Sequence, residues 1–365
     1  MKVNILHSNL KVYGNEMAFL FPIKYNSKRL KKDYGITVGY FQNINESLYE
    51  SDVLIISSWY IGRELKWWQD DHERVYEFLK TAKSKVKKLI WFDISDSTGT
   101  TQLSVLPYVD SYLKCQILKN KSDYLKKYYA NRVFTNYYYE VFGINDDDPG
   151  EPHLGFIPDK SDLEKISVGW NTGTANYGCY STYWGYLDHY INPLELPKYY
   201  PSRWTSPSSP RSVEFSCRVG YSYHRKTVSY QRKEIANILK NKISIKKVKR
   251  KEYFAEMESS KICISPFGLG EITLRDFEII LSGSLIFKAN CDHMETWPKL
   301  FVKDQTYIDY NWDLSNFEEQ LDNYLQNPNL CIEIAKNCQD IYKNLITTDT
   351  GHNQFCERLE KIIEK

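Results

Sequence analysis

The sequence predicts an α/β protein of two domains, each built from parallel strands that alternate with helices. Three observations support this fold class. Short β-branched runs alternate with helical stretches, a proline-punctuated segment separates two such blocks, and 365 residues suffice for two hydrophobic cores. Alternating strands and helices form parallel sheets with right-handed crossovers. Because ligands gather at the carboxyl ends of such strands, we expect a cleft between the two halves.

The first block contains the strands of one sheet. Short apolar runs predict strands at 2–7, 36–41, 52–57, 88–92 and 109–118. Helical periodicity predicts a long helix at about 61–82 and a shorter one at 122–129. His7, Ser57 and the segment 93–100 each follow a predicted strand, so we expect them at the carboxyl edge of this sheet.

The second block begins near Ser212 and repeats the pattern. Its predicted strands lie at 213–219, 243–245, 262–264 and 284–287. Its predicted helices lie at 228–239, 250–259, 315–326, 330–345 and 351–364. The connection between the blocks is punctuated by Pro193, Pro197, Pro201, Pro207 and Pro210. We place the two domains at 1–195 and 196–345, followed by a helical segment at 346–365.

Composition and charge argue against several classes of protein. A formal net charge of +2 provides no overall field for binding nucleic acid. No apolar stretch approaches the roughly 18 residues of a membrane span, and the N-terminus lacks a signal-peptide core. The eight cysteines form no C-x-x-C pair, which argues against zinc sites and disulfide frameworks. We therefore expect a soluble cytoplasmic protein.

The strongest functional pattern lies at 260–283, where a short apolar strand, a glycine turn and a helix follow one another. Gly268 and Gly270 let the backbone approach a ligand closely. Thr273 or Glu271 lies near the helix start, where free backbone N–H groups can meet an anion. This segment is therefore a candidate site for a phosphate group.

Two charged residues follow on the predicted helix. Arg275 and Glu278 are three residues apart and share one helix face. A cation beside a carboxylate suits a ligand with phosphate and sugar hydroxyls, since the glutamate can accept hydrogen bonds from both ribose hydroxyls. The alternative is an ordinary surface ion pair, and the preceding glycines favour the binding site. Glu271 either contacts the sugar or favours the helix N-terminus through its charge.

A second basic constellation lies upstream. Arg218 closes a predicted strand, Arg225 and Lys226 follow in a turn, and Arg232 lies in the first turns of the next helix. A strand end, a basic turn and a helix N-terminus together form a candidate diphosphate site. The alternative is a solvated basic turn with Arg232 on an exposed helix face.

Carboxylates at a strand end of the first domain are candidates for a general base. Asp93 and Asp96 lie on the loop after the strand at 88–92, and Asp96 is the preferred base with Asp93 as an orienting or structural partner. The alternative is that either carboxylate bonds its own loop in an Asx turn. His7 is a further candidate base, although a lone histidine there is more often structural.

Two charged segments resemble sites but have simpler interpretations. Asp146, Asp147 and Asp148 lie in an acidic turn with Pro149 and Gly150, and nothing nearby in the sequence completes a metal site. The basic run at 240–251 could meet anionic lipid or nucleic acid. Its lysines alternate with apolar residues, which favours a solvated rim around a strand.

The segment 260–284 resembles the donor-binding segment of GT-B glycosyltransferases, and its sequence pattern is most similar to that of exostosin-like and group-1-like members. The resemblance is carried by Ser-Lys-Ile-Cys-Ile-Ser-Pro-Phe-Gly at 260–268, followed by Arg275, Glu278 and Gly283 in the pattern R-x-x-E-x-x-x-x-G. It covers about 210–345 well, and it covers the first domain only through the α/β pattern. Retaining group-1 enzymes typically show E-x7-E, whereas Glu271 and Glu278 are spaced E-x6-E. The role of Glu271 and the stereochemical outcome therefore stay open.

This resemblance implies the GT-B architecture, which has two Rossmann-like domains, a cleft between them and a C-terminal helix that crosses back to the first domain. It implies a nucleotide-sugar donor in the C-terminal domain, an acceptor in the N-terminal domain and no required metal or other cofactor. By position, Glu278 takes the ribose, and Arg218, Arg225 and Arg275 neutralise the diphosphate leaving group.

The expected function is transfer of a sugar to a glycan, glycolipid or similar hydroxyl acceptor in bacterial-type surface polysaccharide synthesis. Peripheral contact with the inner face of a membrane fits such an acceptor, and no nucleic-acid partner is expected. Two alternatives stay open: a nucleotide-sugar epimerase or hydrolase on the same fold, and a non-catalytic protein that binds sugar nucleotides.

Overall fold

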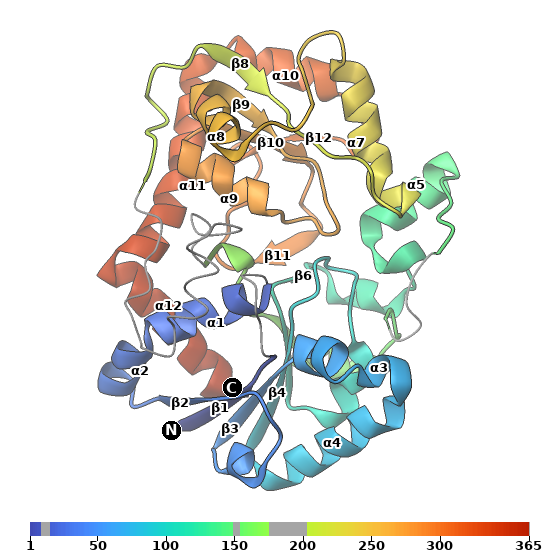
Figure 1. The fold of residues 1–365 in the computed structure, drawn as a ribbon, viewed down its shortest axis with the longest axis vertical. Helices are drawn as coiled ribbons and strands as arrows, with labels where there is room; N and C mark the ends of the chain where they lie inside the picture. The colour runs from blue at the N-terminus through green and yellow to red at the C-terminus, as the bar shows by residue number, and fades with distance from the viewer. Residues whose placement is uncertain (9–14, 149–153, 175–202, 365) are drawn as a thin grey trace.

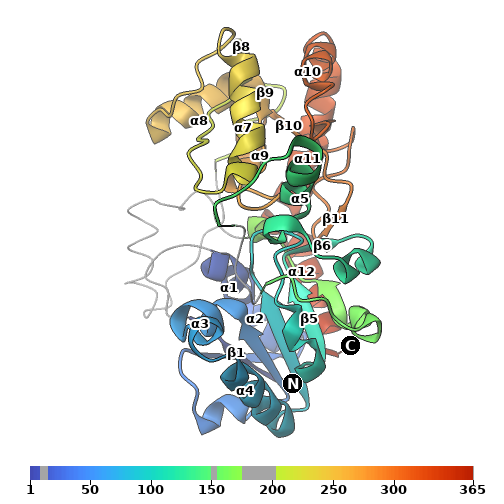
Figure 2. The same cartoon turned by 90° about the vertical axis from the view of Figure 1, so that its right-hand side faces the viewer.

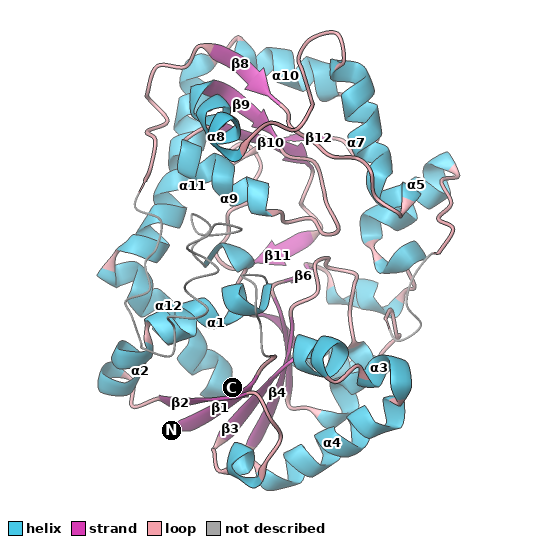
Figure 3. Cartoon of the chain, viewed as in Figure 1, coloured by secondary structure: helices cyan, strands magenta, loops and turns pink. Residues whose placement is uncertain are grey.

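Two α/β halves, one above the other, make up the protein (Figures 1 and 2). The computed structural model describes residues 1–8, 15–148, 154–174 and 203–364. Each half has a parallel sheet between helices (Figure 3). The predicted domain boundary at 195/196 lies outside the described residues.

The N-terminal sheet has six parallel strands among the described residues, in the order β2-β1-β3-β4-β5-β7. Its strands are β1 (Lys2–Leu6), β2 (Thr37–Phe41), β3 (Val53–Ser57), β4 (Lys88–Asp93), β5 (Ser111–Lys114) and β7 (Ile166–Val168). All five residues of β3 are buried, as the continuous apolar run of a central parallel strand requires.

Helices and short turns connect these strands. The α-helices are α1 (Asn15–Tyr25), α2 (Ser27–Asp33), α3 (Trp67–Asp70), α4 (His72–Lys85) and α5 (Val133–Phe142). A short π-helix covers Tyr60–Glu64, and short 3₁₀ helices cover Glu46–Tyr49, Leu103–Tyr108, Lys121–Leu125, Tyr129–Asn131, Lys160–Lys165 and Thr172–Thr174. The single helix predicted at 61–82 is broken, because Lys66 adopts a left-handed conformation and Asp71 is extended. The Asp71 side chain caps α4 by accepting from the Arg74 N–H.

The strand predicted at 109–118 is also divided. Its second part, β6 (Gln116–Leu118), leaves the N-terminal sheet and pairs antiparallel with β11 (Met294–Thr296) of the C-terminal half. This two-stranded sheet joins the two halves (Figure 1).

The C-terminal sheet has four parallel strands in the described part of the chain, in the order β12-β10-β9-β8. They are β8 (Val213–Ser216), β9 (Ser260–Ile264), β10 (Leu285–Ala289) and β12 (Ile308–Tyr310). The strand predicted at 243–245 is absent from this sheet, and those residues are irregular. Neighbouring polar groups in this segment bond the Arg218 side chain, namely the Lys246 carbonyl at 2.9 Å and the Ser244 hydroxyl at 3.2 Å.

The helices of this half surround the sheet and continue into the crossing segment. They are α7 (Lys226–Leu239), α8 (Arg250–Ser259), α9 (Leu274–Ser282), α10 (Phe317–Leu325), α11 (Pro328–Thr347) and α12 (Asp349–Glu364). Phe355, Leu359 and Ile363 of α12 are buried in a core cluster that includes Val3 and Ile5 of β1. The last helix therefore crosses back onto the first domain, as predicted.

The observed arrangement confirms the predicted fold class. Two Rossmann-like domains face each other and the C-terminal helix crosses back, which is the GT-B architecture. Each domain has its own large core, one built around Ile262, Phe277 and Phe287 and the others around the N-terminal sheet.

Candidate active site

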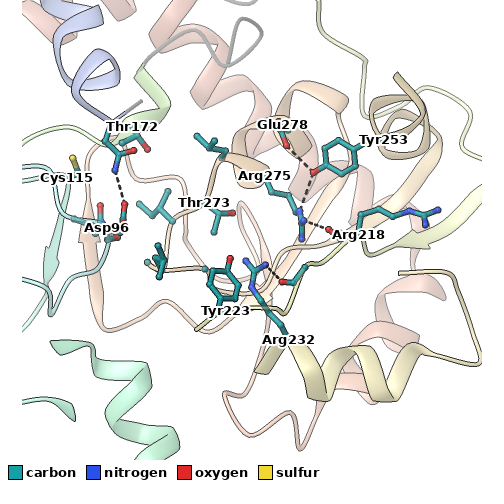
Figure 4. Close-up of a pocket in the computed structure, with 18 of the residues that line it drawn as sticks. Asp96, Cys115, Thr172, Arg218, Tyr223, Arg232, Tyr253, Thr273, Arg275 and Glu278 are labelled. Carbon is teal, nitrogen blue, oxygen red and sulfur yellow. Dashed lines mark hydrogen bonds between the residues drawn. The ribbon is translucent and has the colours of Figure 1, made fainter. Parts of the chain in front are cut away.

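A cavity of about 670 Å³ lies between the two domains and is lined by both of them (Figure 4). The first domain contributes Asn15, Ile94, Ser95, Asp96, Cys115, Gln116 and Thr172. The second contributes Arg218, Gly220, Tyr223, Arg232, Lys247, Val248, Arg250, Tyr253, Gly268, Leu269, Gly270, Ile272, Thr273, Leu274, Arg275 and Glu278. The sequence-predicted residues at this cavity are Asp96, Arg218, Arg232, Gly268, Gly270, Thr273, Arg275 and Glu278.

A buried ion pair between Asp276 and Lys288 stabilises the segment that contains the glycine turn. Thr273 is the N-cap of α9, and its backbone N–H donates to the Asp276 carboxylate at 2.7 Å in a capping box. Lys288 lies 3.0 Å from the same carboxylate, and both side chains are fully buried. The Ser265 hydroxyl donates to Asp276 at 2.6 Å. These bonds hold the first turn of α9 in place at the cavity wall.

Arg275 and Glu278 lie together on α9, as their spacing predicts, and a tyrosine links them (Figure 4). Arg275 Nε donates to the Tyr253 hydroxyl at 3.2 Å, and that hydroxyl donates to Glu278 at 3.0 Å. Arg275 Nη2 donates to the Arg218 carbonyl, whereas Nη1 is buried with no hydrogen-bond partner in the described structure. Burial raises the pKa of Glu278, which the hydrogen bond from Tyr253 and the charge of Arg250 oppose.

Arg232 supports the same wall through backbone groups. Its guanidinium donates to the carbonyls of Phe267, Pro266 and Gly220. It lies 5.1 Å from the centre of the Tyr223 ring, and burial lowers its pKa. In the described structure no carboxylate lies within ion-pair distance of Arg232, so its positive charge remains available to the cavity.

The other two arginines predicted at the diphosphate are placed differently. The Arg218 guanidinium makes two hydrogen bonds of 2.9 and 3.0 Å from Nε to Glu256 and points away from Arg275 (Figure 4). Its charge is therefore already neutralised, and its backbone carbonyl is the group that meets Arg275. Arg225 is the N-cap residue of α7 and does not line the cavity.

Asp96 lies on the first-domain side of the cavity, across from Arg275 and Glu278 (Figure 4). Asn15, the first residue of α1, donates its side-chain amide to Asp96 Oδ1 at 2.8 Å. The Gln116 amide donates to the Asp96 carbonyl. The carboxylate of Asp96 is thus oriented by a neutral donor and borders the cavity, where a general base would have to lie.

Asp93 does not reach the cavity. It is fully buried, 3.1 Å from Lys114 Nζ, and it accepts from the Tyr112 hydroxyl and from the Ser95 N–H at 2.8 Å. The bond from Ser95 is the Asx turn that was the alternative interpretation. Asp93 therefore supports the Asp96 loop, in the structural role that was its second predicted role.

His7 is also buried away from the cavity. Its Nδ1 lies 3.0 Å from the Ser8 carbonyl, and burial lowers the pKa of His7 to about 4. An imidazole that is neutral and enclosed at neutral pH has no path to an acceptor hydroxyl in the described cavity, so this position favours the structural interpretation.

Glu271 does not line the cavity either. Its carboxylate is fully buried and accepts hydrogen bonds from Ser97 and Thr98 of the first domain. Neither role proposed for it from the sequence, a sugar contact or a charge at the helix N-terminus, describes these bonds.

Sequence reasoning missed several residues that line the cavity, namely Asn15, Tyr223, Lys247, Arg250 and Tyr253. Lys247 and Arg250 belong to the basic run at 240–251, which was interpreted as a solvated rim. The signal that could have found them is the density of cations directly before Tyr253, because a diphosphate site requires positive charge.

The acidic turn has a structural role in the described residues. The Asp146 carboxylate accepts from the Thr227 N–H at 2.8 Å and from its hydroxyl at 2.6 Å, in the first turn of α7. Asp147 pairs with Lys226 at 2.7 Å. No three His, Cys, Asp or Glu side chains of the described residues cluster to hold a metal ion. Nor does any described helix combine the length and apolar character needed to cross a membrane.

Comparison with known proteins finds likeness only in structure. No protein-family model and no curated protein matches the chain. HepE from Anabaena, solved in complex with UDP, is similar over 99% of this chain and 100% of that chain, with 12% identity and a TM-score of 0.46. A glycosyltransferase from Rickettsia africae covers 100% of this chain and 97% of its own, with 13% identity and a TM-score of 0.44. Sucrose-phosphate synthase from Thermosynechococcus elongatus covers 100% and 99%, with 9% identity and a TM-score of 0.45.

Proposed function

We propose that the protein is a glycosyltransferase that moves a sugar from a nucleotide-activated donor to a hydroxyl acceptor. The observation that carries this proposal is the asymmetry of the interdomain cavity. One wall has the half-buried Arg275 and the buried Arg232 beside the carboxylate of Glu278, and the opposite wall has the carboxylate of Asp96. Such a cavity suits a ligand with a diphosphate at one end and a reacting hydroxyl at the other.

The donor is proposed to lie against α9 and the glycine turn. Arg275 Nη1, which has no hydrogen-bond partner among the described residues, would donate to a phosphate oxygen, with Lys247 and Arg250 adding positive charge at the rim. Glu278 would accept hydrogen bonds from the ribose hydroxyls. Gly268 is buried and lines the cavity, and a Cβ added there would lie 3.4 Å from the Arg232 guanidinium and from Thr273, so a larger side chain would fill space beside the proposed phosphate site.

Transfer requires the diphosphate to leave with its negative charge stabilised. The fixed guanidinium of Arg275 supplies that stabilisation without reorganising, which is the most effective form of electrostatic catalysis. In an inverting route, Asp96 removes the proton of the acceptor hydroxyl, and Asn15 holds its other oxygen. A retaining route needs no such base. Because arginines supply the charge, we propose that no metal is required and that transfer continues in EDTA.

We propose a glycan or a lipid-linked sugar as acceptor, in surface polysaccharide or glycolipid assembly. The first-domain wall has Asn15, Ser95, Gln116 and Thr172, whose neutral polar groups suit sugar hydroxyls. The exposed cations of the run at 240–251 would allow contact with an anionic membrane at the inner face.

The experiment has two stages. A thermal-shift panel of UDP, GDP, CDP, CMP and their sugars identifies the donor, because a ligand of the native state raises its melting temperature. Glu278→Ala should then reduce transfer by at least about 100-fold, since two hydrogen bonds to a charged group contribute about 1.5–3 kcal/mol each. Its melting temperature should stay close to that of the wild type.

Glu252→Ala is the matched control, because it removes an exposed glutamate from α8 with the same change of charge. Near-wild-type transfer by Glu278→Ala would overturn the assignment. Consumption of the nucleotide-sugar without an acceptor would indicate an epimerase or hydrolase instead.

A further inference from the structure

We infer that Glu271 is a positioning residue that fixes the Asp96 loop against the donor-binding glycine turn. This inference rests on the proposed function and assigns Glu271 a role that differs from a donor contact. The carboxylate belongs to the C-terminal domain, and the groups that bind it belong mainly to the N-terminal domain.

Three hydrogen bonds join the two segments. Glu271 accepts from the Ser97 hydroxyl at 3.0 Å, the Thr98 N–H at 3.0 Å and the Thr98 hydroxyl at 2.7 Å. All three side chains are completely buried. Oε1 accepts from both hydroxyls and Oε2 accepts from the backbone N–H, so the first domain binds both oxygens of the carboxylate.

Because Glu271 is charged, separating its carboxylate from the Asp96 loop is energetically unfavourable. Burial alone would raise the pKa of Glu271, but His293 at 3.4 Å and the hydrogen bond from Thr98 outweigh it and lower the pKa to about 2. The carboxylate is therefore ionised at neutral pH. Moving the Asp96 loop away would leave a buried anion without its donors, which is strongly unfavourable.

Two neighbouring contacts interlock the same segments. A Cβ atom at Gly270 would overlap the Asp96 carbonyl, so only glycine allows this approach of the two backbones. Arg132 of the first domain, which is buried, donates from Nε to the Leu269 carbonyl at 2.6 Å. The glycine turn is thus held by the first domain at three consecutive residues.

The contact at Glu271 sets the distance between Asp96, the proposed base, and the proposed donor site. Asp96 immediately precedes Ser97, and Gly270 immediately precedes Glu271, so the contact lies one residue from each reacting side of the cavity. A misplacement of about 1 Å at such a site can lower the rate about 100-fold. Glu271 therefore acts through Asp96, and its loss should affect turnover more than donor binding.

The test compares Thr98→Val, which removes the hydroxyl and keeps the shape, with Thr98→Ser, which keeps the hydroxyl. We expect Thr98→Val to lower kcat by about 10- to 100-fold. Its donor KM, and the Kd for the nucleoside diphosphate that stabilises the wild type, should stay within about twofold. Thr98→Ser should retain most of the turnover. Where Thr98→Val does not fold, Ser97→Ala removes one of the other two bonds and should show the same kcat-selective loss.

Several outcomes would overturn the inference. They are wild-type kcat in Thr98→Val, an equal loss in Thr98→Val and Thr98→Ser, or a loss of nucleotide affinity in proportion to kcat. Failure of the proposed function is distinguishable, because the wild type would then bind no nucleoside diphosphate and transfer no sugar, and the inference would fail with it. A wild type that transfers sugar beside a fully active Thr98→Val would overturn the positioning role alone.

Discussion

Replacing Arg275 with methionine tests the proposed donor site most directly. The methionine side chain fills much of the same volume but removes the charge and the donors. The arginine makes a hydrogen bond of 3.2 Å to Tyr253 and another to the Arg218 carbonyl, while its Nη1 is buried without a partner in the described structure. A buried donor without a partner is unusual in a folded protein, and a ligand would satisfy it.

The magnitude follows from that one free donor. A hydrogen bond to a charged group contributes about 1.5–3 kcal/mol, so Arg275→Met should weaken the Kd of a nucleoside diphosphate about 10- to 150-fold. The free energy of unfolding without ligand should change far less. Two hydrogen bonds are lost, but a desolvated guanidinium without a carboxylate is removed, and these effects oppose each other to within about 1 kcal/mol.

Titration calorimetry with the nucleotide identified by thermal shift measures the first quantity, and urea unfolding measures the second. Arg203→Met is the matched control. It removes the same charge from the same domain, at a side chain that is 80% exposed and paired with Glu258. Wild-type affinity in Arg275→Met would refute the donor site. An equal weakening in Arg203→Met would show that only the overall charge of the domain matters.

Three further predictions follow from individual contacts. Burial raises the pKa of Glu16 from 4.5 to about 7, so above pH 4.5 the folded chain retains a proton that the unfolded chain releases. The wild type should therefore lose stability as the pH rises, whereas Glu16→Gln should not, and the variant should gain up to about 3 kcal/mol in free energy of unfolding relative to the wild type. Urea unfolding at pH 5 and pH 8 measures this difference, and a difference that does not change with pH would contradict the prediction. Gly270→Ala should lower the free energy of unfolding by about 1–3 kcal/mol in urea titrations, because the added methyl overlaps the Asp96 carbonyl, and unchanged stability would disprove the close approach. Asp96→Asn should lower transfer by about 100-fold or more in an inverting route while leaving calorimetric nucleotide affinity intact, and full activity would exclude Asp96 as the base.

The fold was predictable wherever local periodicity determines an element. The strand at 2–7 and the helix at 228–239 needed only their own apolar pattern, and both occur in the structure. The predicted helix at 61–82 failed because Asp71 caps a new helix inside the pattern. The strand at 109–118 divides because its second part pairs with a strand of the other domain, a contact that local periodicity does not encode.

The candidate site shows the same contrast between local features, which the sequence predicts, and long-range contacts, which it does not. The proximity of Arg275 and Glu278 was predictable because one helix holds both residues and their spacing fixes their relative position. Arg218 was expected at the diphosphate, but Glu256, 38 residues further along the chain, neutralises it. Glu271 meets Ser97 across 174 residues. Partners this distant leave no signal in a single sequence, so local motifs predict which residues are charged but not which charges remain available.

Two matching buried ion pairs hold the charged groups of the cavity in place. Asp93 with Lys114 lies beneath the Asp96 loop, Asp276 with Lys288 lies beneath the glycine turn, and all four side chains are fully buried. Each pair fixes one wall from inside its own domain, and Glu271 joins the walls where they meet. Arg275 can then keep a donor that has no partner among the described residues, because the backbone around it is not free to rearrange and supply an acceptor. Electrostatic stabilisation of a leaving group requires such rigidity, because a donor that must first reorient stabilises the transition state less.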